Sequence, residues 1–170
     1  RLLGCPYDED GRAAADGAPD ADLLDDLLAD DYFRRPPPKS TGREKFGAAY
    51  VDALLAEGPS RREDLLATAT ALTARSVAHA LERFVLPRHG LDVVIASGGG
   101  THNAELMRQL GALLHPVPVR TTADYGVDPD AKEALCFAVL AHEFVNGAPT
   151  NLPAVTGAAR PALLGKLSLP

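Results

Sequence analysis

Three consecutive glycines are the part of this 170-residue chain that best suits ligand chemistry. They stand in the run Ser-Gly-Gly-Gly-Thr-His-Asn at residues 97–103. Glycine adopts backbone angles and tolerates close approaches that a Cβ would forbid. Between a strand and a helix N-terminus, such a turn directs backbone N–H groups and the positive end of the helix dipole at one spot, which suits a phosphate or a nucleotide. A tight turn that binds nothing is the alternative, because the spacing matches neither a Walker A loop nor Gly-x-Gly-x-x-Gly.

Acidic side chains form the second set of candidates: Asp124, the pair Asp128 and Asp130, and Glu133. Asp128 precedes a proline, so the role of helix N-cap explains it without any chemistry. Glu133 follows in the first turns of the same helix. There it either binds a ligand or forms a solvated surface pair with Lys132.

Histidine and serine give weaker signals. His102 could touch a phosphate, although a structural role in the first turn of a helix is the simpler account. The remaining histidines show no ligand spacing, so no His-bound metal is predicted. The sequence has no nucleophile elbow and no defensible Ser-His-Asp arrangement. Spacing alone therefore supports an α/β protein with one anion or nucleotide site.

A βαβ unit is predicted to position the glycine turn. Residues 92–96 are mostly β-branched and apolar, which predicts a strand buried on both faces. Leucines at spacings of three and four predict a helix over residues 104–114. Residues 117–121 predict a second strand, which Pro118 places at an edge or irregularity. Together they make a parallel pair with a helical crossover.

Further helices are predicted on both sides of this unit. They cover residues 20–29, two segments that open at the capping boxes Thr41/Glu44 and Ser60/Glu63, and residues 128–146. Residues 4–19 are predicted to form a loop. The Ser and Thr hydroxyl groups of the long helix after Ser60 are expected to donate hydrogen bonds to backbone carbonyls of the same helix. A two-stranded sheet is marginal alone. Further strands therefore either hide in the irregular segments or lie in sequence outside this chain.

The composition excludes several classes of protein. A net charge of -6 with interspersed signs argues against a nucleic-acid surface, and no apolar run approaches a membrane span. No signal peptide is recognisable, and Cys5 and Cys136 are expected to be reduced thiols in a cytosolic protein. The chain begins at Arg1 and its only methionine is Met107, so we expect it to be part of a longer protein.

Four segments resemble signatures of the anhydro-N-acetylmuramic acid kinase family. They are residues 36–44 (Pro-Pro-Pro-Lys-Ser-Thr-Gly-Arg-Glu), 97–103, 130–134 (Asp-Ala-Lys-Glu-Ala) and 151–158 (Asn-Leu-Pro-Ala-Val-Thr-Gly-Ala). They occur in the family's order and cover essentially the whole chain. The chain corresponds to roughly the C-terminal half of a family member.

The resemblance implies a fold and an activity. The fold would be α/β, with residues 1–170 forming the C-terminal lobe of the actin-like ATPase and sugar kinase fold. The reaction would use ATP, Mg²⁺ and water to convert 1,6-anhydro-N-acetylmuramic acid to N-acetylmuramic acid 6-phosphate, in cell-wall recycling in a bacterial cytoplasm. The nucleotide would lie against Ser97, Gly98, Gly99 and Gly100, and Glu133 would bind the sugar.

The resemblance also implies what this chain lacks. The family's phosphate loop, its catalytic Asp and an Asp-Thr-Gly-Pro-Gly-Asn type segment have no counterpart here, so no catalytic residue is assigned and the chain alone is not expected to turn over ATP. The partner that the resemblance implies is a small sugar substrate, the composition argues against nucleic acid and membrane, and a homodimer is one possible assembly. The alternative is a non-catalytic fragment or interaction module of the same fold.

Overall fold

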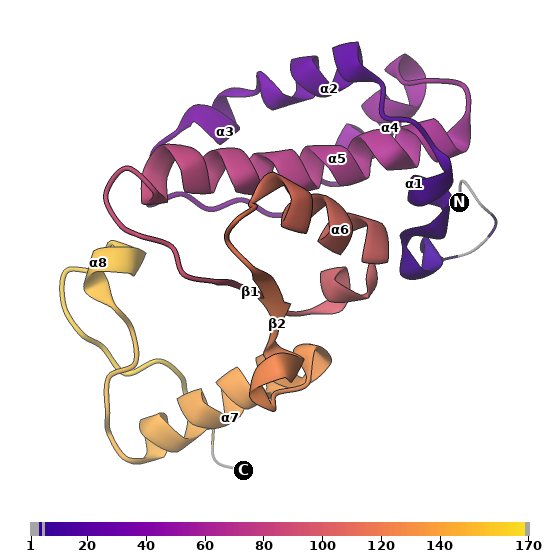
Figure 1. Cartoon of the computed structure of the whole chain (residues 1–170). Helices are drawn as coiled ribbons and strands as arrows, with labels where there is room; N and C mark the ends of the chain where they lie inside the picture. The colour runs from indigo at the N-terminus through magenta and orange to yellow at the C-terminus, as the bar shows by residue number, and fades with distance from the viewer. Residues whose placement is uncertain (1–3, 5, 169–170) are drawn as a thin grey trace.

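The computed structural model describes residue 4 and residues 6–168, and helices dominate it (Figure 1). The α-helices are α1 (Arg12–Asp16), α2 (Ala21–Leu28), α3 (Asp31–Arg34), α4 (Ala48–Glu57), α5 (Arg62–Ala80), α6 (Ala104–Leu113), α7 (Lys132–Val145) and α8 (Pro153–Thr156). The strands are β1 (Val94–Ala96) and β2 (Val119–Thr121). A π-helical turn, η2 (Leu81–Val85), extends α5, and the 3-10 turns are η1 (Glu9–Gly11), η3 (Gly99–His102), η4 (Thr122–Tyr125) and η5 (Pro129–Ala131).

Helix α5 is the centre of the packing. One of its faces carries small residues, among them Ala71, Ala74 and Ala78, each at most 3% exposed. Small side chains let neighbouring helices approach closely, so α2 packs on one side through Leu24 and α6 on the other through Leu110. Figure 1 shows α5 between α2 above and α6 below. The two apolar clusters therefore share one helix.

The buried hydroxyl of Thr68 links α5 to the start of α2. Its Oγ1 donates to the Asp64 carbonyl at 2.7 Å and accepts from the Asp20 N–H at 2.9 Å. Thr73 and Ser76 likewise donate to backbone carbonyls three or four residues earlier. The expected bonding of these hydroxyls to their own helix is confirmed, and the buried Thr68 oxygen is left with both partners it needs.

The predicted βαβ unit is confirmed, with shorter strands. β1 and β2 pair in parallel, with Val94 opposite Val119 and Ala96 opposite Thr121. Val94 and Val119 pack against the cluster around Leu110, so α5 and α6 cover that face. The prediction that the first strand is buried on both faces is wrong, because Ile95 on the opposite face is 48% exposed.

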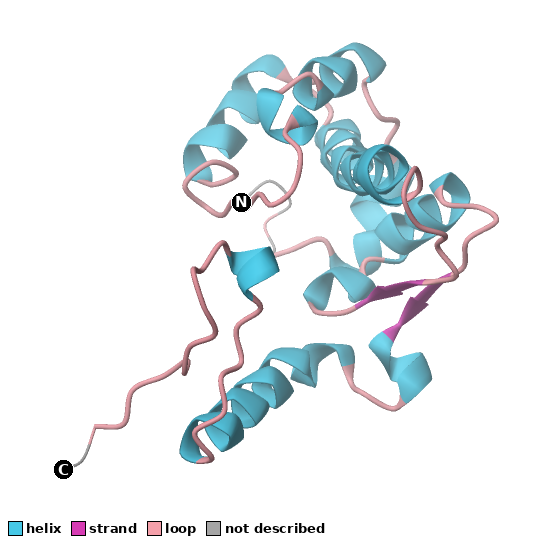
Figure 2. Cartoon of the chain, turned by 90° about the vertical axis from the view of Figure 1, so that its left-hand side faces the viewer, coloured by secondary structure: helices cyan, strands magenta, loops and turns pink. Residues whose placement is uncertain are grey.

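Helix α7 lies on the other side of the sheet from α5 and α6 (Figures 1 and 2). Asp128 caps the preceding turn by accepting from the Asp130 N–H, and Gly147 follows the helix end with a φ of 68°. The predicted stop is thus confirmed, whereas the predicted start at Asp128 begins the 3-10 turn η5, and α7 itself begins three residues after Pro129, at Lys132. Apolar side chains of α7 reach solvent, with Phe137 71% and Val145 80% exposed. Within the described residues the sheet has two strands, so the irregular segments contribute none.

Both predicted capping boxes are wrong as helix starts. The Glu44 carboxylate accepts a hydrogen bond from the Gly42 N–H at 2.6 Å, and α4 begins only at Ala48. Helix α5 begins at Arg62 without a side-chain cap. Glu63 instead pairs with the Arg61 side chain at 3.5 Å. In each case a competing partner takes the glutamate that the box requires.

The N-terminal segment is more ordered than the loop predicted from its composition. Asp8 accepts hydrogen bonds from the N–H groups of Ala13 and Ala14 at 2.9 and 3.0 Å, which caps α1. Ala14 is then buried against the helical layer. Cys136 is a free, exposed thiol, whereas Cys5 lies outside the described residues. Over the part of the chain that is described, no helix is long and apolar enough to cross a membrane.

Candidate functional site

The glycine turn connects β1 to α6 as predicted, but it forms a small helix of its own. Gly98 has a φ of 85°, which favours glycine, and Gly99–His102 make the 3-10 turn η3. Asn103 then caps α6, with its Oδ1 accepting from the Leu106 N–H at 2.9 Å. A Cβ added at Gly98 or Gly99 would meet no atom within 4 Å. Open space therefore lies directly in front of the turn.

A cavity of about 770 Å³ occupies this space. Its wall comes from three separate segments and consists of Tyr7, Asp8, Glu9, Asp10, Gly99, Gly100, His102, Asn103, Leu106 and Asp130. The volume falls in the range of sites that enclose a nucleotide-sized ligand. Of the four residues predicted to bind nucleotide, Gly99 and Gly100 line the cavity, whereas Ser97 and Gly98 do not.

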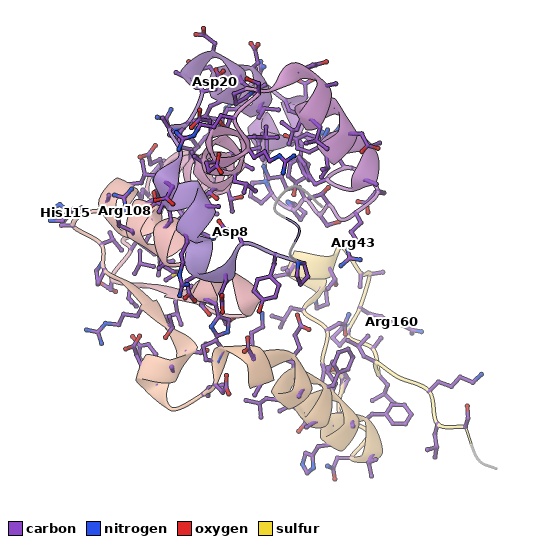
Figure 3. The ribbon with its side chains drawn as sticks, turned by 90° about the vertical axis from the view of Figure 1, so that its right-hand side faces the viewer. Asp8, Asp20, Arg43, Arg108, His115 and Arg160 are labelled. Atoms are coloured by element: carbon purple, nitrogen blue, oxygen red, sulfur yellow. The ribbon has the colours of Figure 1, made fainter. Side chains whose placement is uncertain are left out.

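The N-terminal wall of the cavity was not foreseen from the sequence. Figure 3 shows Asp8 at the foot of α1, beside α6. Gly11 brings this segment into close contact, since a Cβ there would lie 2.0 Å from the Asn103 side-chain oxygen. Its φ of 71° also favours glycine. The Asp8-x-x-Gly11 spacing is the signal in the sequence, but only the fold shows what it contacts.

The cavity wall is acidic. Among the described residues that line it are four carboxylates, Asp8, Glu9, Asp10 and Asp130, and no Lys or Arg. Asp8 is occupied by backbone N–H groups, and Asp10 pairs with the Arg12 side chain at 2.8 Å. Carboxylates suit the hydroxyl donors of a ribose and disfavour a bare phosphate. The wall therefore matches the nucleoside part of a nucleotide better than its phosphate chain.

The turn is tied to the start of α7 by two contacts. The Gly98 N–H donates to the Pro129 carbonyl at 3.0 Å. The His102 Nε2 lies 2.8 Å from Asp130 Oδ2. These contacts bring together two segments that the sequence separates by about 30 residues.

The remaining acidic candidates lie outside the cavity wall. Asp124 accepts from the Thr121 N–H at 2.7 Å and so closes its own turn. Glu133 lies in the first turn of α7, exposed to solvent, and within the described chain no ion pair joins it to Lys132. It is four residues beyond the Pro129 carbonyl that the glycine turn contacts.

The side chains of the site do not form a cage for a metal ion. Across the described residues, no three His, Cys, Asp or Glu side chains gather to hold one. Mg²⁺ usually binds through one or two carboxylates together with substrate phosphates.

The proline-rich segment at residues 36–44 serves the helical layer. The Lys39 Nζ donates to the carbonyls of Tyr32 and Phe33 at 2.9 and 3.3 Å, and it lies over the rings of Tyr32 and Phe84. None of the described residues of this segment lines the cavity. Its contacts hold the end of α3 against the end of the long helix.

Comparison with known proteins gives a consistent result. The model of the family described as anhydro-N-acetylmuramic acid kinase matches residues 1–169. A protein of that name from Salinibacter ruber is 60% identical over 173 residues, which cover 100% of this chain and 44% of that protein. Others from Gloeobacter violaceus and Caldanaerobacter subterraneus are 49% and 43% identical, over 96% of this chain and 43% and 42% of their own lengths. The chain thus spans less than half the length of these relatives. Since the family model matches the chain almost from end to end, the chain belongs to the anhydro-N-acetylmuramic acid kinase family.

Proposed function

We propose that this chain is part of a kinase that converts 1,6-anhydro-N-acetylmuramic acid, ATP and water to N-acetylmuramic acid 6-phosphate. Family membership supports the reaction, since relatives that match the whole chain carry the name of this kinase. Residues 1–170 would form the C-terminal lobe of an actin-like fold. The setting would be cell-wall recycling in a bacterial cytoplasm.

The contribution of this chain would be the adenosine side of the nucleotide site. The observation that carries this assignment is the cavity in front of Gly99 and Gly100, which combines open space at the glycines with an acidic wall. Backbone N–H groups of the turn would contact the adenine, the ribose or the α-phosphate. Ser97 and Gly98 would shape the turn from behind, and the Mg²⁺ that accompanies ATP would be held by the phosphates.

The chemical step would take place beyond this chain. In the proposed reaction, water attacks C1 of the anhydro sugar, the bridge opens, and the freed O6 takes the γ-phosphoryl group. A general base must accept the proton of the water. We assign that base to the part of a full-length kinase that this chain does not cover, and this chain would fix the nucleotide against it.

Glu133 would belong to the sugar site. Its carboxylate is exposed and lies in the first turn of α7, close in the chain to Pro129, which contacts the glycine turn. A carboxylate in that place can accept hydrogen bonds from sugar hydroxyls. The proposal fails if replacing Glu133 leaves the sugar kinetics of an active kinase unchanged.

The test of the main proposal uses a chimera. Residues 1–170 replace the matching segment of the Salinibacter ruber relative, which is 60% identical and so should accept them. The chimera is assayed for ADP release that depends on the anhydro sugar, with ATP titrated. Gly99→Val should raise the KM for ATP at least tenfold, and a properly folded variant with an unchanged KM would refute the nucleotide site.

The alternative, an interaction module, has one observation in its favour. Phe137 and Val145 on α7 expose unusually large apolar surfaces. In a full-length kinase the same surface could contact the part that this chain lacks. The chimera separates the two functions, because an interaction module would leave it inactive even when folded.

A further inference from the structure

We propose that His102 and Asp130 form a positioning pair that orients the glycine turn for nucleotide binding. The inference rests on the proposed function, because it assigns a role within the nucleotide site. Neither residue is taken to touch the reacting atoms. The pair acts through the turn.

The geometry shows how the pair holds the turn. Gly98 precedes η3 and His102 ends it, so the Gly98–Pro129 bond at 3.0 Å and the His102–Asp130 contact at 2.8 Å fasten both ends of η3 to η5. Over the described residues, these are the hydrogen bonds that join this turn to η5. Loss of the histidine contact would leave the turn fastened to η5 at Gly98 only.

The acceptor is itself held in place. The Asp130 N–H donates to Asp128 Oδ1 at 2.9 Å, which fixes the backbone of η5 next to the pair. An ionised carboxylate only accepts, so the hydrogen lies on His102 Nε2. An amide at either position keeps one donor and one acceptor in this contact, so it can replace the original side chain.

The location gives the pair a functional consequence. His102 and Asp130 both line the cavity together with Gly99 and Gly100. The position of the turn's backbone in the cavity wall depends on the orientation of η3, which the two contacts with η5 fix. Fixed donors lose less freedom on binding, so the pair should strengthen nucleotide binding and leave the sugar and the chemical step unaffected.

The test is a set of variants in the chimera. His102→Ala and Asp130→Ala should each raise the KM for ATP by about two- to fivefold, the range for an exposed pair, with kcat and the sugar KM unchanged. The double variant should be no worse than either single one. His102→Gln and Asp130→Asn should restore the KM. His142→Ala is the matched control, because His142 is also exposed and lies 3.9 Å from Glu143, but it does not line the cavity.

A second measurement needs no activity. In the 170-residue chain, His102→Ala should speed hydrogen exchange at the Gly98 amide, whose bond to Pro129 the pair supports. Additive effects of the two alanine variants, an equal effect of His142→Ala, or unchanged exchange at Gly98 would overturn the inference. If Gly99→Val raises the KM for ATP and His102→Ala does not, only this inference fails. If Gly99→Val has no effect, the nucleotide site itself is wrong.

Discussion

Gly99→Val probes the nucleotide site with little disturbance of the fold. The backbone of Gly99 is outside the left-handed region that its neighbour Gly98 occupies, so an L-residue is tolerated there. A Cβ at this position would meet no atom within 4 Å, so there is open space next to the backbone for a larger side chain. The free energy of unfolding should therefore change by no more than about 0.5 kcal/mol. The valine side chain would instead project into the space assigned to the nucleoside.

The expected size of the binding effect follows from that geometry. Valine blocks the approach of a ligand to the backbone of Gly99 and Gly100, which is the contact that three glycines make possible. We expect the KM for ATP in the chimera to rise at least tenfold, which corresponds to about 1.4 kcal/mol. Gly99→Ala adds one methyl group only and should give a smaller increase.

The assay measures ADP release at saturating sugar and varied ATP, with Gly111→Val as the matched control. Gly111 lies in α6, outside the cavity wall, and a Cβ there also meets nothing within 4 Å. The same substitution should therefore leave the KM for ATP unchanged. An equal rise for both variants, or no rise for a stable Gly99→Val protein, would refute the assignment of the turn.

Three further expectations concern the sugar site, the core and the pH dependence of stability. Glu133→Gln in the chimera should raise the KM for the anhydro sugar or lower turnover, because roughly 1.5–3 kcal/mol of sugar binding is lost. The kinetics with ATP should not change. Normal sugar kinetics in this variant would show that Glu133 does not bind the sugar. Leu110→Ala should lower the free energy of unfolding, measured by urea denaturation, by about 3 kcal/mol. The reason is that Leu110 is only 7% exposed and packs between α5, α6 and the sheet. A loss below about 1 kcal/mol would contradict this packing. The side-chain hydrogen bond from Lys45, together with the one from the Tyr32 N–H, holds the pKa of Asp30 below its ordinary value of 3.8. The ionised Asp30 therefore stabilises the fold above pH 3.8. This contribution is lost as the pH falls through the lowered pKa. Lys45→Met should therefore cost about 0.5 kcal/mol in urea at neutral pH, after solvent screening, and nothing in strong acid, whereas a difference that persists in acid would exclude the ion pair as its cause.

Local signals in the sequence determined the elements around the glycine turn. Apolar periodicity located α6, Asp128 located the turn that leads into α7, and Gly147 located the end of α7, because these signals act between residues a few positions apart. The hydroxyl bonds of α5 were foreseen for the same reason. The family resemblance, carried by four short segments, was confirmed by a match across the chain.

Other local signals failed where the side chain has a different partner or the packing differs from the expected one. Glu44 bonds to Gly42 and Glu63 pairs with Arg61, so neither starts a helix as its capping box predicted. The strand around Ile95 was expected to be buried on both faces, yet the packing covers only one. A pattern of residue types does not determine which of several possible hydrogen-bond or packing partners a side chain contacts in the fold.

The cavity itself was decided only by the tertiary structure. Its wall joins the segment at Asp8, the glycine turn and Asp130, which are far apart in the chain. Periodicity and capping carry no information about such distances, because they describe residues within one element. Close packing of Gly11 on Asn103 and the contact between His102 and Asp130 bring the three segments together. The sequence thus determined the strand, the glycine turn and the helix that follows it, and the packing of distant segments determined the acidic space in front of the turn.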